Sequence, residues 1–222
     1  MTAIIFDCDG VLVDSEIIAM RAGMRALKEL GLTYDEDDFI HRHCGTTVAA
    51  YLKSIEGDHQ SAFGKPLPDG FVEKLMQETK DEMDASLEAV PGVHDVVDSI
   101  QHPLAVASSS GLNRLHFKLK KTDLHHRFDP HIYSGDHVKK GKPAPDLFLF
   151  AAEQLGIHPE KCIAIEDSVN GVKSALAAGM TVIGFTGGSH CRPSHTKHLL
   201  DAGASVVANH MGKLLSTLED LT

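Results

Sequence analysis

Short apolar runs alternate with segments of helical periodicity along most of the chain. The first run, Ala3 to Phe6, is rich in β-favouring residues, and comparable runs occupy 104–108, 131–134, 162–166, 181–185 and 205–208. Helical patterns lie between them, at about 93–100, 112–121, 145–155, 169–178 and 195–202. Near-continuous apolar strands that alternate with helices are typical of a parallel sheet buried on both faces. The pattern therefore predicts an α/β fold with a doubly wound, mostly parallel, Rossmann-like sheet and helices on both faces.

One stretch interrupts this alternation. From about residue 15 to residue 87 the chain has no strand pattern, only amphipathic helical segments. Apolar residues share one face of an early segment (Met20, Met24, Leu27, Leu30) and of a later one (Phe71, Leu75, Met83). We therefore expect two domains, an α/β core formed by 1–14 and 88–222, and a helical domain, 15–87, inserted directly after the first strand.

Composition and charge exclude several classes of partner. The 222 residues carry 21 Lys and Arg against 31 Asp and Glu, a formal net charge of −10, which argues against nucleic acid. No run approaches the roughly 18 to 20 apolar residues that cross a membrane, and the chain opens on a strand pattern instead of a secretory signal. The four cysteines (Cys8, Cys44, Cys162, Cys191) show no paired spacing. We expect a cytoplasmic protein, monomeric or weakly homo-oligomeric, whose cysteines are mostly small core residues.

Two carboxylates follow the first predicted strand. Asp7 and Asp9 stand two residues apart, and Gly10 comes next, so the backbone can bend and a ligand can approach closely. Like charges on such a turn repel each other unless a cation neutralises them, and hard divalent ions such as Mg²⁺ prefer oxygen ligands. An acidic loop at a strand end is the simpler alternative.

Polar residues also follow three further predicted strands. The second strand ends at Ser108, the third is followed by Lys142 and Pro143, and the fourth ends in Glu166 and Asp167. Taken singly, each has an ordinary explanation: a serine helix cap, a solvated basic turn, or capping acids. Ligands of doubly wound sheets bind at the carboxyl ends of the strands, however. Carboxylates, hydroxyls and a lysine at four such ends favour a site for a metal ion and a phosphate.

These segments resemble the four motifs of the haloacid dehalogenase (HAD) superfamily, in order. The matching segments are Asp7-Cys8-Asp9-Gly10-Val11-Leu12-Val13-Asp14-Ser15, Ser108, Lys142-Pro143-Ala144-Pro145-Asp146 and Glu166-Asp167-Ser168. The resemblance runs through almost the whole chain and includes a helical cap inserted after the first motif. It is strongest to small sugar-phosphate phosphatases of the β-phosphoglucomutase and 6-phosphogluconate phosphatase type.

The resemblance implies a phosphatase that uses Mg²⁺. Asp7 would be the nucleophile that forms an aspartyl-phosphate, and Asp9 would protonate the leaving group and then activate water. The implied Mg²⁺ ligands are carboxylate oxygens of Asp7 and Asp167, the carbonyl oxygen of Asp9, and Glu166 directly or through water.

The same resemblance assigns the phosphoryl contacts. Ser108 and Lys142, with backbone amides around Cys8 and Ser109, would hold the phosphoryl oxygens. An acid at Asp9 separates phosphate-ester enzymes from the dehalogenases and phosphonate hydrolases of the superfamily.

The helical domain would select the substrate. β-Phosphoglucomutases carry a histidine on the first cap helix where this chain has Ala19, which favours a phosphatase over a mutase. Arg42 resembles the basic cap turn of phosphatases for acidic sugar phosphates, and Glu16 could accept sugar hydroxyls; surface positions are the alternatives for both. We therefore expect hydrolysis of a small sugar or sugar-acid phosphate. The other possibilities are a β-phosphoglucomutase-type phosphotransferase and a catalytically idle HAD-fold binding protein.

Histidines gather near the end of the chain. His190, Cys191, His195 and His198 fit no standard zinc spacing and fall in a late loop and helix. The sequence favours no metal there and leaves a second metal site as the alternative.

Overall fold

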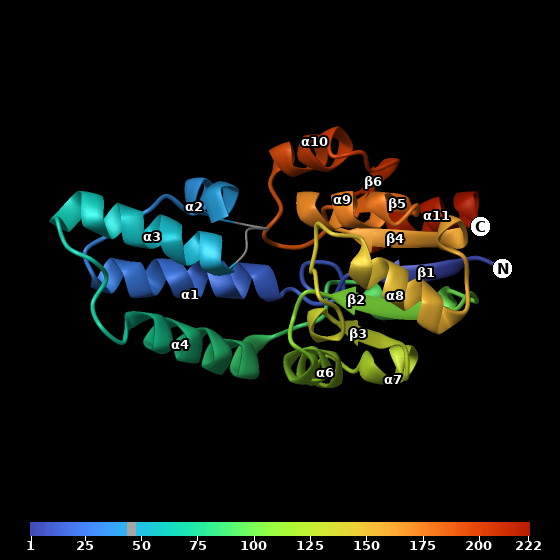
Figure 1. The fold of residues 1–222 in the computed structure, drawn as a ribbon, viewed down its shortest axis with the longest axis horizontal. Coiled ribbons are helices and arrows are strands. Elements are labelled where there is room, and N and C mark those ends of the chain that lie inside the picture. Colours follow the sequence, from blue (N-terminus) through green and yellow to red (C-terminus); the bar gives the residue numbers. More distant parts are fainter. Residues whose placement is uncertain (44–47) are drawn as a thin grey trace. The chain divides into compact units, whose positions relative to one another are not determined.

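The chain divides into two compact units in the computed structural model, which describes residues 1–43 and 48–222. Residues 1–14 and 88–222 form one unit, and residues 15–87 form the other (Figure 1). The expectation for Cys44 falls outside the described residues.

The first unit is built on six parallel strands in the order β3-β2-β1-β4-β5-β6. The strands are β1 (Ala3–Phe6), β2 (Leu104–Ser108), β3 (Ile132–Ser134), β4 (Cys162–Glu166), β5 (Thr181–Phe185) and β6 (Val206–Ala208). All five pairings are parallel. This confirms the predicted doubly wound sheet, and the strand order changes direction between β1 and β4. Doubly wound sheets bind ligands at the carboxyl ends of the strands beside such a reversal, which here are those of β1 and β4.

Helices cover the sheet on both faces, as predicted. The helices of this unit are α5 (Val93–Ser99), α6 (Leu112–Lys121), α7 (His125–Phe128), α8 (Asp146–Leu155), α9 (Val169–Ala177), α10 (Pro193–Asp201) and α11 (Met211–Leu221), with 3₁₀ turns η1 (Gly135–His137) and η2 (Pro159–Lys161). One face of the sheet packs against α8, α9 and α10 in a core that contains Ile5, Phe148 and Val172. The alternate strand positions face the other layer, where Phe6 meets Phe128 of α7 edge-on at 5.9 Å.

The described residues of the second unit form four helices. They are α1 (Ser15–Glu29), α2 (Glu36–His43), α3 (Val48–Phe63) and α4 (Phe71–Ser86), and α1 contacts both α2 and α4. Gly23 of α1 makes room for the Tyr51 side chain of α3, because a Cβ there would lie 2.3 Å from the Tyr51 hydroxyl. Met20 and Leu27 are buried in this unit, as their shared face predicts.

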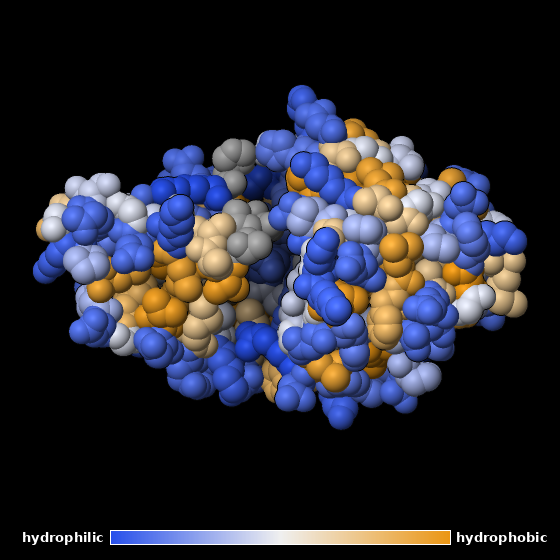
Figure 2. Space-filling model, viewed as in Figure 1, coloured by the Kyte–Doolittle hydropathy of each residue, from blue (hydrophilic) through white to orange (hydrophobic). Residues whose placement is uncertain are grey.

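The outer surfaces are of mixed polarity. Figure 2 shows apolar side chains of each unit lying among hydrophilic ones on the face drawn, which is usual for folded domains. Within the described residues, no helix combines the length and the apolar character that a bilayer crossing requires.

Candidate active site

Asp7 stands at the switch point of the sheet. Its backbone N–H extends the β1–β4 pairing by donating to the Ile165 carbonyl at 2.9 Å, so the side chain leaves β1 beside the end of β4. The following turn contains Gly10 at a φ of 77°. A Cβ at Gly10 would lie 2.0 Å from Asp167 Oδ2, so only glycine lets the two acidic segments pack together.

Lys142 lies between two of the carboxylates. Its ammonium donates to Asp7 Oδ1 at 2.6 Å, to Glu166 Oε1 at 2.5 Å and to the Ala107 carbonyl at 2.8 Å. An ammonium has three donors, and all three are used here. The side chain is only 5% exposed, so the alternative of a solvated basic turn is wrong.

Glu166 is fixed from both sides. One carboxylate oxygen accepts from Lys142, and the other accepts from the Ser168 hydroxyl at 3.1 Å and the Ser168 N–H at 3.3 Å. The carboxylate lies directly over Gly171, where a Cβ would be 1.9 Å from its carbon. Ser168 is the N-cap of α9, accepting from the Gly171 N–H at 3.0 Å, so Glu166 and Asp167 are not capping acids.

Buried negative charge concentrates at this point. Asp7, Glu166 and Asp167 are buried, and one oxygen of each lies within 4.8 Å of the others. Burial raises the pKa of Asp7 to about 7, a rise that Glu166 and Asp9 reinforce and Lys142 opposes. Burial also raises the pKa values of Glu166 and Asp167; the neighbouring carboxylates reinforce this rise and Lys142 opposes it. Three carboxylates face one ammonium, and a divalent cation would balance the remaining two negative charges.

Asp9 belongs to a second polar cluster. Its Oδ1 accepts an ion-paired hydrogen bond from Lys118, and its Oδ2 accepts from the Ser110 hydroxyl at 2.9 Å and the Ser108 hydroxyl at 3.3 Å. Lys118 also donates to the Ser110 hydroxyl at 2.9 Å. The helix that follows is capped elsewhere, with Gly111 at the N-cap, so the helix-cap alternative for Ser108 is wrong.

Lys118 and Ser110 were missing from the predicted site. The sequence does hold a signal for Lys118, because it recurs with Leu115 and Leu119 at helical spacing and all three are buried on α6. A lysine on the apolar face of a helix needs a buried partner, and here that partner is Asp9. Burial would lower the pKa of Lys118, but the charge of Asp9 and its hydrogen bond raise it overall.

Asp167 meets a histidine outside the predicted catalytic set. His190, fully buried in the loop after β5, places Nε2 3.0 Å from Asp167 Oδ2. The same loop is tied to the first motif, since Asp14 accepts hydrogen bonds from the backbone N–H of Ser189 at 3.0 Å and from its hydroxyl.

The predicted substrate contacts are distributed over both units. Ser109 is exposed directly after β2. Glu16 lies in the first turn of α1 and Arg42 near the end of α2, both in the helical unit. Arg42 donates to Asp58 at 2.7 Å, and the Tyr34 hydroxyl donates to the same carboxylate at 2.9 Å.

Known proteins resemble this chain over most of its length. The haloacid dehalogenase-like hydrolase family matches residues 4–185. The 6-phosphogluconate phosphatase of Escherichia coli is 31% identical over 86% of the chain and 85% of its own length. A phosphorylated carbohydrates phosphatase of Thermotoga maritima is 33% identical over 92% of each.

A solved structure extends the likeness to the fold. A conserved haloacid dehalogenase-like protein of unknown function from Agrobacterium tumefaciens is 37% identical, with a TM-score of 0.91, over 100% of this chain and 99% of its own. Phosphatases of this family generally use a divalent metal, and the acidic cluster of Asp7, Glu166 and Asp167 is consistent with one. The match over most of the chain and the shared fold show that the chain belongs to the haloacid dehalogenase-like hydrolase family.

Proposed function

We propose that the protein is a Mg²⁺-dependent phosphatase that hydrolyses a small sugar or sugar-acid phosphate through an aspartyl-phosphate on Asp7. The observation that carries this proposal is the placement of Asp7 at the switch point of the sheet, beside Lys142 and the carboxylates of Glu166 and Asp167. The names of the two phosphatase relatives favour a phosphorylated carbohydrate as the substrate class.

Asp7 is suited to attack phosphorus. Its Oδ1 accepts from Lys142, which fixes the carboxylate in one orientation and leaves Oδ2 for the reaction. Attack by Oδ2 forms the O–P bond as the bond from phosphorus to the sugar oxygen breaks. With its pKa raised to about 7 even beside Lys142, the buried carboxylate would be held fully ionised at neutral pH by a further cation.

The three clustered carboxylates fit a hard divalent ion. Asp7 and Asp167, with the Asp9 carbonyl, would hold Mg²⁺, and Glu166, whose oxygens already accept from Lys142 and Ser168, would act through water. Bound Mg²⁺ supplies charge neutralisation between the nucleophile and the phosphoryl oxygens. Lys142 holds Asp7 and Glu166 in register for this ion, since one ammonium joins both.

Asp9 would carry the proton in both half-reactions. It gives a proton to the departing sugar oxygen and later takes one from the water that attacks the aspartyl-phosphate. Lys118 favours the ionised form of Asp9, which is the form that takes the proton from water. Ser108 and Ser110 orient the same carboxylate, because both hydroxyls donate to its Oδ2.

The phosphoryl oxygens would bind at the carboxyl ends of β1 and β2. Lys142, the Ser108 hydroxyl and the amides near Cys8 and Ser109 line that edge of the sheet. Substrate would draw the Ser108 hydroxyl away from Asp9, whose bond to it is the longer of the two serine contacts.

The helical unit would choose between substrates. Ala19 stands where β-phosphoglucomutases carry a histidine, which favours water as the phosphoryl acceptor over a second sugar. Arg42 and Glu16 are the proposed contacts to the sugar portion, with Arg42 pairing a carboxylate of an acidic sugar. A β-phosphoglucomutase-type phosphotransferase is the second candidate.

A substrate panel tests the proposal. Phosphate release is measured with Mg²⁺ on phosphorylated sugars, sugar acids and polyols, with Asp7→Asn as the inactive control. We expect release from at least one acidic sugar phosphate, and none from Asp7→Asn. Interconversion of β-glucose phosphates without phosphate release would select the mutase, and no turnover of any kind would contradict both candidates.

A further inference from the structure

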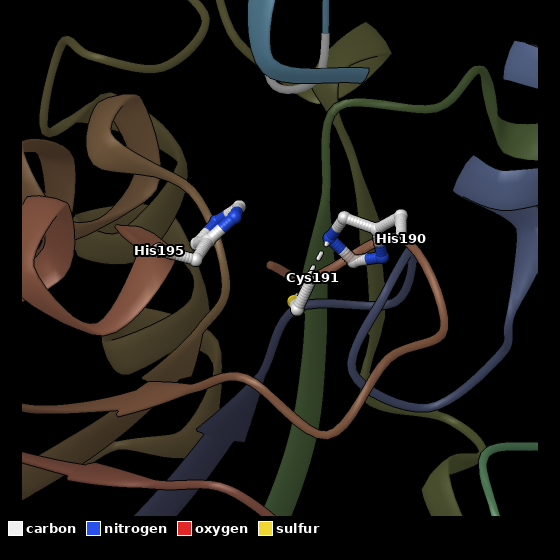
Figure 3. A group of neighbouring side chains, drawn as sticks. All are labelled: His190, Cys191 and His195. Atoms are coloured by element: carbon white, nitrogen blue, oxygen red, sulfur yellow. Dashed lines mark hydrogen bonds between the residues drawn. The ribbon is translucent and has the colours of Figure 1, made fainter. Parts of the chain in front are cut away.

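Two histidines and a cysteine lie close together beside Asp167, one of the proposed Mg²⁺ ligands. His195 Nε2 lies 2.7 Å from the Asp167 carbonyl oxygen, and His190 Nε2 lies 3.0 Å from Asp167 Oδ2. Cys191 Sγ is 3.4 Å from His190 Nε2. Figure 3 shows His195, from α10, facing the loop that carries His190 and Cys191. One ligand atom from each of the three residues lies within 4.8 Å of the others.

The donor set is that of a transition metal. Imidazole nitrogen and thiolate sulfur bind Zn²⁺-class ions, whereas the oxygen-only set of Asp7, Glu166 and Asp167 suits Mg²⁺. Zn–N bonds of about 2.0 Å and Zn–S bonds of about 2.3 Å separate neighbouring donors around a tetrahedral ion by roughly 3.3 to 3.8 Å. The 3.4 Å between His190 Nε2 and Cys191 Sγ falls in that range.

The loop holds these donors in place without a metal. Ser189 is bound to Asp14 through its backbone N–H and its hydroxyl, and the Cys191 N–H donates to the Gly188 carbonyl at 3.0 Å. Gly188 packs so tightly that a Cβ there would be 2.8 Å from the Gly10 carbonyl oxygen. The ion would therefore have to order little of this loop when it binds, which lowers the entropy cost of binding.

The geometry points to a second metal site: His190, Cys191 and His195 bind a Zn²⁺-class ion, and that ion slows the reaction at the neighbouring Asp167. One nitrogen cannot ligate an ion and donate to a carboxylate at once. Binding through His190 Nε2 moves the proton that this nitrogen shares with Asp167 to Nδ1, or to solvent where both ring nitrogens carry one, and binding through Cys191 releases the thiol proton to solvent. Asp167 then loses a partner that orients it, and such losses commonly reduce metal affinity or activity about 10- to 100-fold. The inhibitory effect rests on the proposed function, whereas ion binding does not.

Binding is tested first without catalysis. Asp7→Asn protein in excess Mg²⁺ is titrated with Co²⁺, and a thiolate-to-Co²⁺ absorption band in the near ultraviolet reports ligation by Cys191. We expect the band in Asp7→Asn and in Asp7→Asn/His198→Ala, because His198 is exposed on the same helix and outside the donor cluster. Adding Cys191→Ser should abolish the band. Adding His195→Ala should weaken Co²⁺ binding at least about tenfold, as expected when one of three protein ligands is removed.

Alkylation of Cys191 in the unsubstituted protein tests the site without relying on variants that could fail to fold. Zn²⁺ should slow alkylation of Cys191 at least about tenfold, because a metal-bound thiolate is blocked. Cys8 and Cys162, which are buried, provide the internal comparison by peptide mass spectrometry. Absence of both the Co²⁺ band and this protection would overturn the site.

Inhibition is tested last, in excess Mg²⁺. Zn²⁺ should lower turnover of the unsubstituted and His198→Ala enzymes, and Cys191→Ser, compared with its own rate in Mg²⁺, should resist. Equal inhibition of Cys191→Ser would overturn the coupling to Asp167. A Co²⁺ band in a protein that hydrolyses none of the phosphate esters would refute the proposed function and leave the metal site standing.

Discussion

Removing the buried charge of Lys118 should damage both stability and turnover. Lys118→Met keeps most of the side-chain volume but removes the ammonium that pairs with Asp9 and donates to Ser110. The Lys118 side chain is 4% exposed and that of Asp9 is 18% exposed, so the carboxylate would lose its charged partner in a largely dry environment.

The size of the stability loss in Lys118→Met follows from the burial of the ion pair and from the contacts that Asp9 keeps. Breaking a buried ion pair by removing one partner typically costs about 3 to 5 kcal/mol. Asp9 keeps two serine hydroxyls and some solvent, so we expect a loss below that range, about 2 to 3 kcal/mol. For a chain of this size that corresponds to a fall of roughly 4 to 12 °C in Tm.

The effect on turnover should be specific to one step. Asp9 without Lys118 is less readily ionised and takes a proton from water less readily, so hydrolysis of the aspartyl-phosphate should slow more than its formation. We expect kcat to fall about 10- to 100-fold, less than the roughly 10²- to 10⁴-fold loss for Asp9→Asn. The measurements are thermal unfolding and rapid-quench kinetics, in which Lys118→Met should show a burst of sugar release.

Lys120→Met is the matched control. Lys120 is on the same helix but exposed, so its loss should change stability by less than about 0.5 kcal/mol and leave kcat unchanged. If Lys118→Met behaved like Lys120→Met in both assays, the Lys118–Asp9 pair would have neither the structural nor the catalytic role inferred for it.

Four further predictions concern the glycine under the carboxylate, the metal requirement, the pH dependence of metal stabilisation and the helical unit. Gly171→Ala should lower activity at least about tenfold by displacing the Glu166 carboxylate that lies over it. The control Gly57→Ala, in open space on α3, should leave activity unchanged and stability unchanged or higher. Equal activity in the two variants would refute this packing role of Gly171. Chelation should abolish activity, Mg²⁺ should restore it and Ca²⁺ should inhibit, and persistence in excess chelator would exclude a metal-dependent reaction. Because the pKa of Asp7 is raised to about 7, its contribution to metal-free stability is present at low pH and lost as pH rises through 7. The Tm increase caused by Mg²⁺ should therefore grow between about pH 6 and pH 8. A smaller Tm increase at pH 8 than at pH 6 would contradict the assignment of Asp7 as a metal ligand. Arg42→Ala should raise KM for acidic sugar phosphates about 10- to 100-fold, the loss of a charge-assisted pair, with little effect on neutral ones. Asp58→Asn, which removes the partner of Arg42 in the helical unit, should spare KM; equal losses in both variants would make the Arg42–Asp58 pair structural.

Local patterns were enough to predict the sheet. The apolar runs of β2, β4 and β5 match the observed strands residue for residue, because strands buried on both faces leave a continuous apolar signal. The helices were less certain at their ends, and α10 begins at Pro193, two residues before the predicted start. Helix α11 was missed, although the helical spacing of Met211, Leu214 and Leu218, which are buried, is a local signal for it.

The contacts within the site could not be predicted from the sequence, because they depend on the three-dimensional fold. Position along the chain indicated Asp7, Lys142 and Asp167, since each follows a strand whose end could be recognised. Position along the chain could not show that Lys118, on the helix that follows Ser108, pairs with Asp9. Nor could it show that the loop after β5 brings His190 to Asp167, because chain distance carries no information about where a loop folds.

The identity of the phosphorylated residue tests the proposed mechanism most directly. Enzyme mixed with a phosphorus-labelled substrate from the panel is quenched in acid within one turnover, and the labelled peptide is sequenced by mass spectrometry. We expect label on Asp7, stable in acid and released by hydroxylamine as for an acyl phosphate, and no label in Asp7→Asn. Label on another residue, or turnover of Asp7→Asn within tenfold of the unsubstituted enzyme, would contradict it.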